Sequence, residues 1–382
     1  MRRVIVWEAI NTQYDVLNYF ARGLASGLRA LGWSVLEVPL SDPAALRDVW
    51  ETLEELRPDL VVGFNGVGPI INGVDPVDAA GITQVLWLVD HPVYHLLRIG
   101  LRKSAIVGCV DLSHEDYMET VFSGCPTLFL PHGVNTELAE GLEEERSFSI
   151  VLAGSYRDPD RIRCEWEQRL PPNLSRLLDD IAQTAVFSDL PLHHHVRNVL
   201  RQVLSDDRHA EMARFEAVVL PYVDKYVRNV RRRLVVKALR GRTIHVFGNG
   251  DWAMLNDDGG LRLHGAVDFR EMARVFRRTK VVVNVLPWFT HGSHERPMLA
   301  AYAGAMVLSD RSVWLQHELP QISTFSWEKF DADELATKVA ELLSADRESW
   351  EERTSSAREI IQQYHSWAAR ARLLSEMFCG SR

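Results

Sequence analysis

The residues with the clearest chemical potential lie in one segment, Val281–Asp310. An apolar run there is followed by a polar loop over Thr290–His294 and then by small residues at helical spacing, beginning near Glu295 and Arg296. The start of a helix binds anions through its unpaired backbone N–H groups and its positive dipole end. A guanidinium at that point adds paired hydrogen bonds to a phosphate. The segment therefore predicts a site for a diphosphate, although taken alone Glu295 could be a first-turn acid and Arg296 a surface charge.

A carboxylate and an imidazole follow a second apolar run. Asp90 and His91 come directly after Gln84–Val89. Ligands of parallel sheets bind outside the carboxyl ends of the strands, and groups of this kind move protons there. The alternative for Asp90 is a helix cap.

Other polar features carry weaker predictions. Three histidines at 193–195 have no Asp or Cys at ligand spacing, so no metal site is expected. The basic run from Lys225 to Arg242 is expected to be a solvated helix face, with a phosphate or membrane patch as the alternative. The loop Glu8–Thr12 lacks the glycines of a dinucleotide fold, and the lone G-x-G at 248–250 is most often a turn.

The elements that must position these residues alternate between strand-length apolar runs and amphipathic helices, the first of which span Asp15–Leu31 and Pro43–Leu56. This alternation is typical of parallel sheets covered by helices. In the first half the expected strands are Val4–Trp7, Ser34–Val38, Leu60–Phe64, Gln84–Val89, Ala105–Val110 and Leu128–Leu130. In the second half they are Phe148–Ala153, Thr243–Phe247, Leu261–His264, Lys280–Leu286 and Ala305–Leu308.

The chain is too long for one core, and its polar stretch at 140–146 has no apolar periodicity. We expect an α/β fold with an N-terminal Rossmann-like domain at 1–137 and a C-terminal one at 147–364. A helical insertion is expected at about 160–240, and a helix at 365–382 should pack back toward the N-terminal domain.

Composition limits the partners. The 382 residues carry a net charge of -9, which argues against a nucleic-acid binder. Four scattered cysteines suit a reducing compartment, and no apolar stretch is long enough to span a bilayer. A cytoplasmic enzyme is expected; a peripheral membrane contact and the oligomeric state stay open.

The segment at 281–310 resembles the donor-binding motif of GT-B glycosyltransferases, in particular the group-1 (GT4-like) superfamily with its CgeB-like and flagellin-glycosylation-type members. Its matching residues are Asn284, Pro287, Gly292, His294, Glu295, Arg296, Ala300, Ala303, Gly304 and Asp310. Three further matches follow the family's order, at Pro131–Asn135, Gly154–Arg157 and His264–Val267.

The resemblance implies two Rossmann-like domains facing across a cleft. It also implies hexosyl transfer from a nucleoside-diphosphate sugar to a hydroxyl of a glycan, protein or small molecule, without a metal or other cofactor. The donor-binding residues would be Gly154, Ser155, Arg157, Gly248, His264, Val267, Gly292, Ser293, His294 and Arg296. The catalytic candidates are Asp90, His91 and Glu295, and the candidates on the acceptor side are Glu8, Asn11 and Asn65.

One departure concerns Leu299, which stands where many relatives keep a glutamate that holds the ribose. Ribose recognition is therefore expected from elsewhere. If the reaction inverts the anomeric centre, Asp90 or His91 would deprotonate the acceptor; if it retains, no dedicated base is needed. The alternatives are a nucleotide-sugar epimerase or hydrolase of the same fold, and a non-catalytic two-lobed ligand-binding protein.

Overall fold

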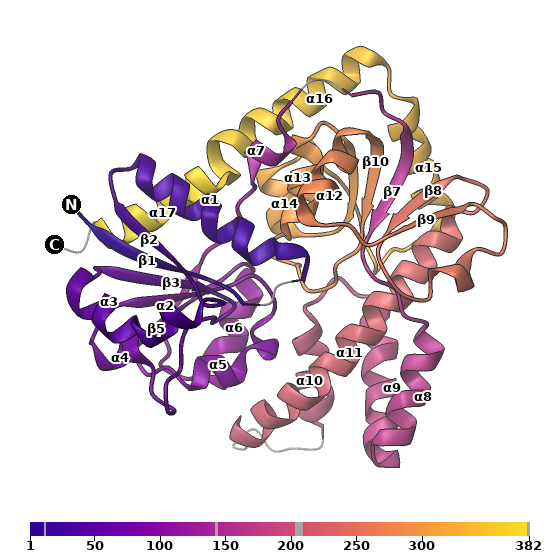
Figure 1. Ribbon diagram of the computed structural model, residues 1–382. Coiled ribbons are helices and arrows are strands. Elements are labelled where there is room, and N and C mark those ends of the chain that lie inside the picture. The colour runs from indigo at the N-terminus through magenta and orange to yellow at the C-terminus, as the bar shows by residue number, and fades with distance from the viewer. Residues whose placement is uncertain (11–12, 142–143, 203–208, 380–382) are drawn as a thin grey trace. The chain divides into compact units, whose positions relative to one another are not determined.

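Two parallel β-sheets organise the chain in the computed structural model, which describes residues 1–10, 13–141, 144–202 and 209–379 (Figure 1). The contacts divide the chain into unit 1, Met1–Glu137 with Ile360–Arg382, and unit 2, Leu138–Glu359. The two sheets have the strand orders β2-β1-β3-β4-β5-β6 and β12-β11-β10-β7-β8-β9. The predicted α/β class with parallel sheets is confirmed.

The sheet of unit 1 is built from strands that are mainly apolar. Its strands are β1 (Arg3–Glu8), β2 (Ser34–Pro39), β3 (Leu60–Phe64), β4 (Gln84–Leu88), β5 (Ala105–Cys109) and β6 (Thr127–Phe129). Every residue of β3 and β4 is buried, as expected for parallel strands covered on both faces. The helices between them are η1 (Gln13–Asp15), α1 (Val16–Ala30), α2 (Pro43–Arg47), α3 (Val49–Leu56), α4 (Pro76–Ala79), η2 (Pro92–Tyr94), α5 (Leu96–Gly100) and α6 (Leu112–Val121). The short α7 (Thr136–Ala139) follows β6.

The end of the chain completes unit 1. A π-helical turn, η4 (Ile361–His365), leads into α17 (Trp367–Cys379), which packs along α1. The Trp367 ring is 2% exposed, and its centroid lies 5.2 Å from that of Phe20 and 5.3 Å from those of Phe64 and Trp87. A Cβ at Gly133 would come within 2.5 Å of the Trp367 ring, so glycine is required for this contact.

In unit 2 the strands are β7 (Phe148–Ala153), β8 (Ile244–Phe247), β9 (Leu261–Gly265), β10 (Thr279–Asn284), β11 (Met306–Asp310) and β12 (Ser323–Phe325). The helices around this sheet are η3 (Trp252–Leu255), α12 (Phe269–Arg277), α13 (Glu295–Tyr302), α14 (Val313–Glu318), α15 (Ala332–Ser344) and α16 (Arg347–Ile360). Among the residues that the structure describes, no helix is long and apolar enough to cross a membrane.

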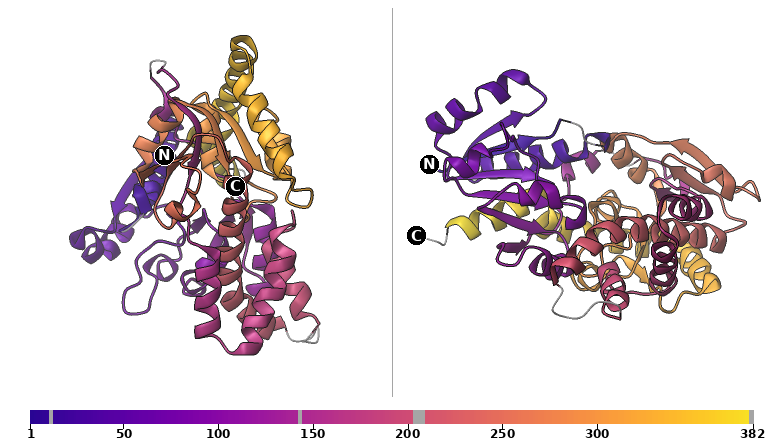
Figure 2. Two further views of the ribbon diagram at one scale, coloured as in Figure 1. Left: turned by 90° about the vertical axis from the view of Figure 1, so that its right-hand side faces the viewer. Right: turned by 90° about the horizontal axis from the view of Figure 1, so that it is seen from below.

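Between β7 and β8, the described part of the chain contains four helices: α8 (Pro159–Arg169), α9 (Pro172–Val186), α10 (Leu192–Leu200) and α11 (His209–Ala238). They lie side by side in Figures 1 and 2, with α11 in contact with each of the other three. The predicted helical insertion is confirmed.

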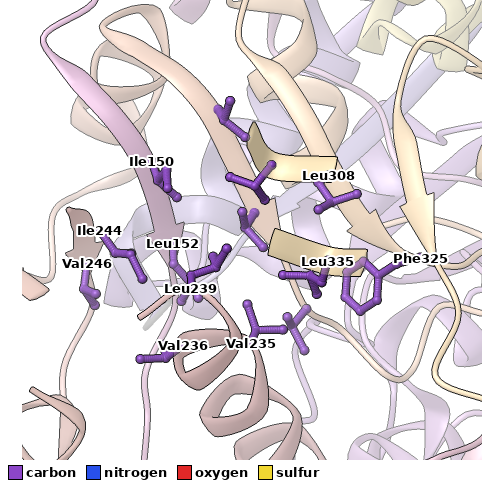
Figure 3. Packing of buried hydrophobic residues seen from close by; sticks show 14 of the residues in the cluster. Ile150, Leu152, Val235, Val236, Leu239, Ile244, Val246, Leu308, Phe325 and Leu335 are labelled. Atoms are coloured by element: carbon purple, nitrogen blue, oxygen red, sulfur yellow. The ribbon is translucent and has the colours of Figure 1, made fainter. Parts of the chain in front are cut away.

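The end of α11 also enters the core of unit 2. Val235 and Val236 pack with Ile150 and Leu152 of β7 in one buried cluster, shown in Figure 3. Burying such a side chain stabilises the fold by roughly 1.5–3 kcal/mol. The C-terminal end of α11 therefore fixes the insertion to the sheet.

Candidate active site

The loops that follow the strands of unit 2 meet at one edge of the sheet, because parallel strands all present their carboxyl ends there. The loop after β7 begins with Gly154, whose φ of 144° is a conformation that L-residues rarely adopt. Its N–H donates to the carbonyl of Phe247 at 2.9 Å. A Cβ at Gly248 would lie 1.9 Å from the Gly154 carbonyl oxygen, so these two candidate glycines allow the loops after β7 and β8 to touch.

The loop before α13 is held by internal hydrogen bonds. The Ser312 hydroxyl donates to the Gly292 carbonyl at 2.6 Å, and the Ser293 hydroxyl donates to the His294 carbonyl at 2.9 Å. His294 caps α13, since its Nδ1 accepts the N–H of Arg296 at 3.4 Å. The same Nδ1 lies 2.6 Å from Oε2 of Glu295, which is only 4% exposed. One of the N–H groups predicted to hold an anion is therefore engaged by the cap, and the Arg296 side chain becomes the main candidate.

Arg296 reaches from the first turn of α13 to the end of β7. Its Nη1 donates to the Ala153 carbonyl at 3.1 Å. Burial lowers the pKa of Arg296, the carboxylate of Glu295 opposes that shift, and repulsion from Arg228 adds to it. A partly desolvated guanidinium at a strand end is a strong binding group for a phosphate.

Two arginines of α11 extend this positive region. Arg232 donates through Nη1 to the Ser155 carbonyl. Burial lowers its pKa well below the usual value, with repulsion from Arg228 and then Arg296 as the next contributions. Arg228, one helical turn earlier, pairs with the buried Asp224, with its Nε 3.3 Å from Oδ1.

The predicted solvated face for the basic run is wrong for two of its members. Arg231 and Arg232 are 3% and 5% exposed. Valines interleaved with the arginines are also buried, so this helix is enclosed on several sides. The sequence analysis did not single out Arg232 as a candidate for the site; the signal that could have done so is the apolar spacing within the run, which is incompatible with a fully solvated face. The buried valines are Val227, Val230, Val235 and Val236.

Arg157 is not brought to the same point. Its guanidinium pairs with Glu165 rather than with the neighbouring aspartates, and its side chain is 43% exposed. Its backbone N–H donates to Oδ1 of Asn229 on α11 at 2.8 Å. Ser155 enters the site through its backbone carbonyl, which accepts from Arg232.

Two stacked rings lie at the ends of β8 and β9. The His264 ring stacks on Phe247 with centroids 4.4 Å apart and an interplanar angle of 5°. Its Nε2 lies 2.9 Å from Nδ1 of His245, and burial lowers the pKa of both imidazoles. Val267, the last donor candidate of this segment, is partly buried.

In unit 1 the candidate carboxylate is accessible. The Asp90 side chain is 53% exposed, and its Oδ2 accepts from Nδ2 of Asn65 at 2.9 Å and lies 3.9 Å from Nε2 of His95. Asn65 has a φ of 52° and accepts the Val89 N–H at 2.8 Å through its side chain, which links the ends of β3 and β4. Asp90 and Asn65 are thus neighbours.

The other candidates of unit 1 are more constrained. His91, not Asp90, caps the following helical turn, because its Nδ1 accepts the Val93 N–H at 3.2 Å. The His91 ring is 1% exposed and lies 4.6 Å from the rings of both His114 and Tyr117. Glu8 pairs with Arg22 at 2.9 Å. Asn11 lies outside the described residues.

Comparisons with known proteins agree with this fold. Residues 228–376 match the family described as glycosyl transferase-like. HepE from Anabaena, solved in complex with UDP-glucose, superposes with a TM-score of 0.58 at 10% identity, over 100% of both chains. Sucrose-phosphate synthase from Thermosynechococcus elongatus gives 0.56 at 12% identity, over 100% of this chain and 99% of that one. AviGT4, a glycosyltransferase involved in avilamycin A biosynthesis, gives 0.54 at 11% identity, over 99% of this chain and 97% of that one.

No curated protein sequence matches the chain significantly. The structural neighbours nevertheless extend over the whole chain and have the two-sheet arrangement expected from the sequence, and the family match covers the predicted donor motif. The comparisons therefore confirm the GT-B fold expected from the motifs, and residues 228–376 match the glycosyl transferase-like family.

Proposed function

We propose that the protein transfers a sugar, of the hexosyl type, from a nucleoside-diphosphate sugar to an acceptor hydroxyl. Unit 2 binds the donor at the carboxyl ends of its strands, and unit 1 binds the acceptor. The observation that carries the proposal is the Arg296 guanidinium, held between the start of α13 and the Ala153 carbonyl at the end of β7.

The chemistry of transfer explains why a cation is needed there. Negative charge grows on the departing diphosphate as the sugar–oxygen bond breaks, so a prepositioned cation stabilises the transition state more than the ground state. Arginines in this position perform the charge neutralisation that a divalent metal supplies in other enzymes. The reaction is therefore proposed to be metal-independent.

The proposed acceptor site depends on the carboxylate of Asp90. Its carboxylate is half exposed and oriented by Asn65, whereas the His91 ring is enclosed by other side chains of unit 1. Asp90 is accordingly the residue proposed to contact the acceptor hydroxyl, and in an inverting reaction it would accept the proton. His91 is proposed to support the loop that carries Asp90.

A thermal-shift series tests the donor site. The ligands are UDP, GDP, ADP, CMP and dTDP, with UDP first because HepE was solved with UDP-glucose. A ligand bound only by the folded protein at one hundred times its Kd stabilises it by about 2.7 kcal/mol. We expect at least one nucleoside diphosphate to raise the melting temperature.

The variant Arg296→Gln should weaken that nucleotide by about 1.5–3 kcal/mol, the contribution of hydrogen bonds to a charged partner. Arg274→Gln is the control, because Arg274 is 53% exposed and pairs within its own helix with Glu271. An unchanged shift in Arg296→Gln would contradict the proposed site. Turnover of the donor without any acceptor would instead favour the epimerase or hydrolase alternative.

A further inference from the structure

The helical insertion contributes charged groups to the same strand end as Arg296. Nη1 of Arg296 donates to the carbonyl of Ala153, and Nη1 of Arg232 donates to that of Ser155, two residues further along the chain. Between them lies Gly154, where a Cβ would stand 2.9 Å from Nη2 of Arg232. Guanidinium groups from α11 and α13 therefore converge on one short stretch of backbone.

Of the three cations here, Arg232 is the least compensated, because the carboxylate of Glu295 already opposes the pKa shift of Arg296. Arg228 pairs with Asp224, and Arg232 is bonded to a neutral carbonyl. The pKa of Arg232 is lowered by burial and by repulsion from the two other arginines, and Asp310 opposes this only as the smallest contribution. Concentrating cations away from water costs free energy, which an anion bound among them would offset.

The arginines of α11 are held in position by residues of the same helix. Asp224 is 1% exposed and pairs with Arg228 four residues later, which fixes that side chain along the helix. Asn229 accepts the Arg157 N–H at 2.8 Å and donates to the Lys225 carbonyl at 2.6 Å. These hydrogen bonds fix the position of α11 relative to the loop after β7.

We infer that α11 supplies two of the cations that hold the donor diphosphate, Arg228 and Arg232, and that Asp224 and Asn229 position them. The inference rests on the proposed function and assigns part of its site to the insertion. The side chain of Arg157, which lies in the loop itself, is 43% exposed and is directed to Glu165 of α8, so its charge is not assigned to the site.

Isothermal calorimetry with inorganic pyrophosphate tests the assignment, because pyrophosphate shares the charged group of every nucleoside diphosphate and lacks a base. It is repeated with the nucleoside diphosphate that gives the largest thermal shift. Arg228→Gln and Arg232→Gln should each weaken both ligands by about tenfold to a hundredfold. Arg163→Gln is the matched control from the same helical insertion, because Arg163 is 50% exposed and pairs with Glu167 and Asp179; it should stay within about twofold of the wild type.

Asp224 acts through Arg228, so its effect should depend on that residue. Asp224→Asn should weaken pyrophosphate less than Arg228→Gln does, and the double variant should bind no worse than Arg228→Gln alone. A residue that merely stabilised the helix would give additive losses. If Arg232→Gln does not fold, the double variant Arg228→Gln with Asp224→Asn still tests the inference, because the Arg228 side chain is 29% exposed and the buried carboxylate is removed together with its cation.

The outcomes separate the two proposals. If neither pyrophosphate nor any nucleoside diphosphate binds the wild type, the proposed function fails and the inference fails with it. If the wild type binds and Arg296→Gln loses affinity while Arg228→Gln and Arg232→Gln do not, the inference is overturned and the proposed function stands. A loss in Arg163→Gln as large as in Arg228→Gln would likewise overturn the assignment to the two arginines of α11.

Discussion

Gly154 illustrates how one residue can serve both the fold and the site. Its φ of 144° requires glycine, and the missing Cβ leaves room for the Arg232 guanidinium. A side chain here would strain the backbone and displace the cation together. Such strained positions concentrate at functional sites.

Gly154→Ala should therefore lower the free energy of unfolding by roughly 1–3 kcal/mol and weaken pyrophosphate binding as well. Gly259→Ala is the control, since Gly259 has a φ of +69° with open space around it. That variant should cost roughly 1 kcal/mol and leave binding unchanged. Urea unfolding and calorimetry measure the two effects, and full binding in Gly154→Ala would refute the link between the glycine and Arg232.

His365 predicts a pH dependence for unit 1. Burial lowers its pKa to about 3, with Arg370 adding to the shift, and its Nδ1 accepts from Nη2 of Arg370 at 2.9 Å. Because the unfolded chain binds a proton near pH 6.5, protonation favours unfolding. The contribution of His365 to the free energy of unfolding is therefore most favourable above pH 6.5 and becomes less favourable as the pH falls toward 3.

His365→Gln keeps an acceptor for Arg370 but cannot titrate, so the loss of stability between pH 6.5 and 4 should become shallower. His317→Gln should leave that slope unchanged, because the His317 side chain is 85% exposed. Denaturant unfolding at several pH values measures the slopes. If the free energy of unfolding falls equally steeply with pH in the wild type and in His365→Gln, another group causes the loss of stability in acid.

The sequence alone indicates some residues of the proposed site but not others. Arg296 is proposed for the site because a polar loop before a small-residue helix is typical of an anion site. Arg228 and Arg232 lie in a basic run whose buried side depends on tertiary packing, so the sequence alone does not single them out. Asp90 and His91 were both placed at a strand end, but periodicity cannot tell which of two consecutive side chains turns inward. The structure shows that His91 does.

At the scale of elements, Arg231 anchors α11 to the end of α9. This side chain donates to the carbonyls of Ala185, Val186 and Ser188 at 2.9, 3.0 and 2.5 Å, and stacks over Trp327 at 4.7 Å. Burial lowers its pKa to about 10. Arg231 thus ties α11 to the end of α9, while Arg228 and Arg232 face the strand ends.

Arg231→Met should lower the free energy of unfolding by about 3–5 kcal/mol, since it leaves three buried carbonyls without their donor and removes a buried cation that interacts with Asp310 and Asp189. The control is Arg240→Gln, which removes an exposed pair with Asp257 and should change stability by less than about 1 kcal/mol. Urea titrations followed by circular dichroism measure both. A loss of under about 1 kcal/mol in Arg231→Met would show that the anchor is dispensable.

Elements with strong patterns were predicted closely. The run Leu60–Phe64 coincides with β3, because a short continuous apolar stretch bounded by polar residues is typical of a strand buried on both faces. The expected helix Pro43–Leu56 is instead two helices, α2 and α3, joined at Asp48. Asp48 has φ −93° and ψ 8°, a local break that amphipathic spacing does not reveal.

At the scale of the molecule, the two units differ in how the chain builds them. Unit 2 is one continuous segment, and the cluster around β7 and α11 lies wholly inside it. Unit 1 is discontinuous, since its sheet comes from the first part of the sequence and α17 from the last. Because Trp367 lies among Phe20, Phe64 and Trp87, removing α17 would leave a large cavity in that core.

Residues 138–359 expressed alone should therefore fold, unfold cooperatively and bind pyrophosphate. Residues 1–137 alone should lack the near-ultraviolet circular dichroism of packed aromatic rings and recover it when a peptide of residues 360–382 is added. A peptide carrying Trp367→Ala is the control and should not restore the signal. A native-like spectrum for 1–137 alone would contradict the requirement for α17.

The position of Trp367 also sets an order of events during synthesis on the ribosome. Residues up to 359 emerge before the tryptophan does, so the continuous unit has its whole sequence available while the earlier-made sheet still lacks the ring that fills its centre. Nascent chains generally fold domain by domain from the N-terminus, but here the first sheet to be translated is the last to be completed. A chain released too early would carry an exposed apolar surface on that sheet, which makes it a target for chaperones and proteases.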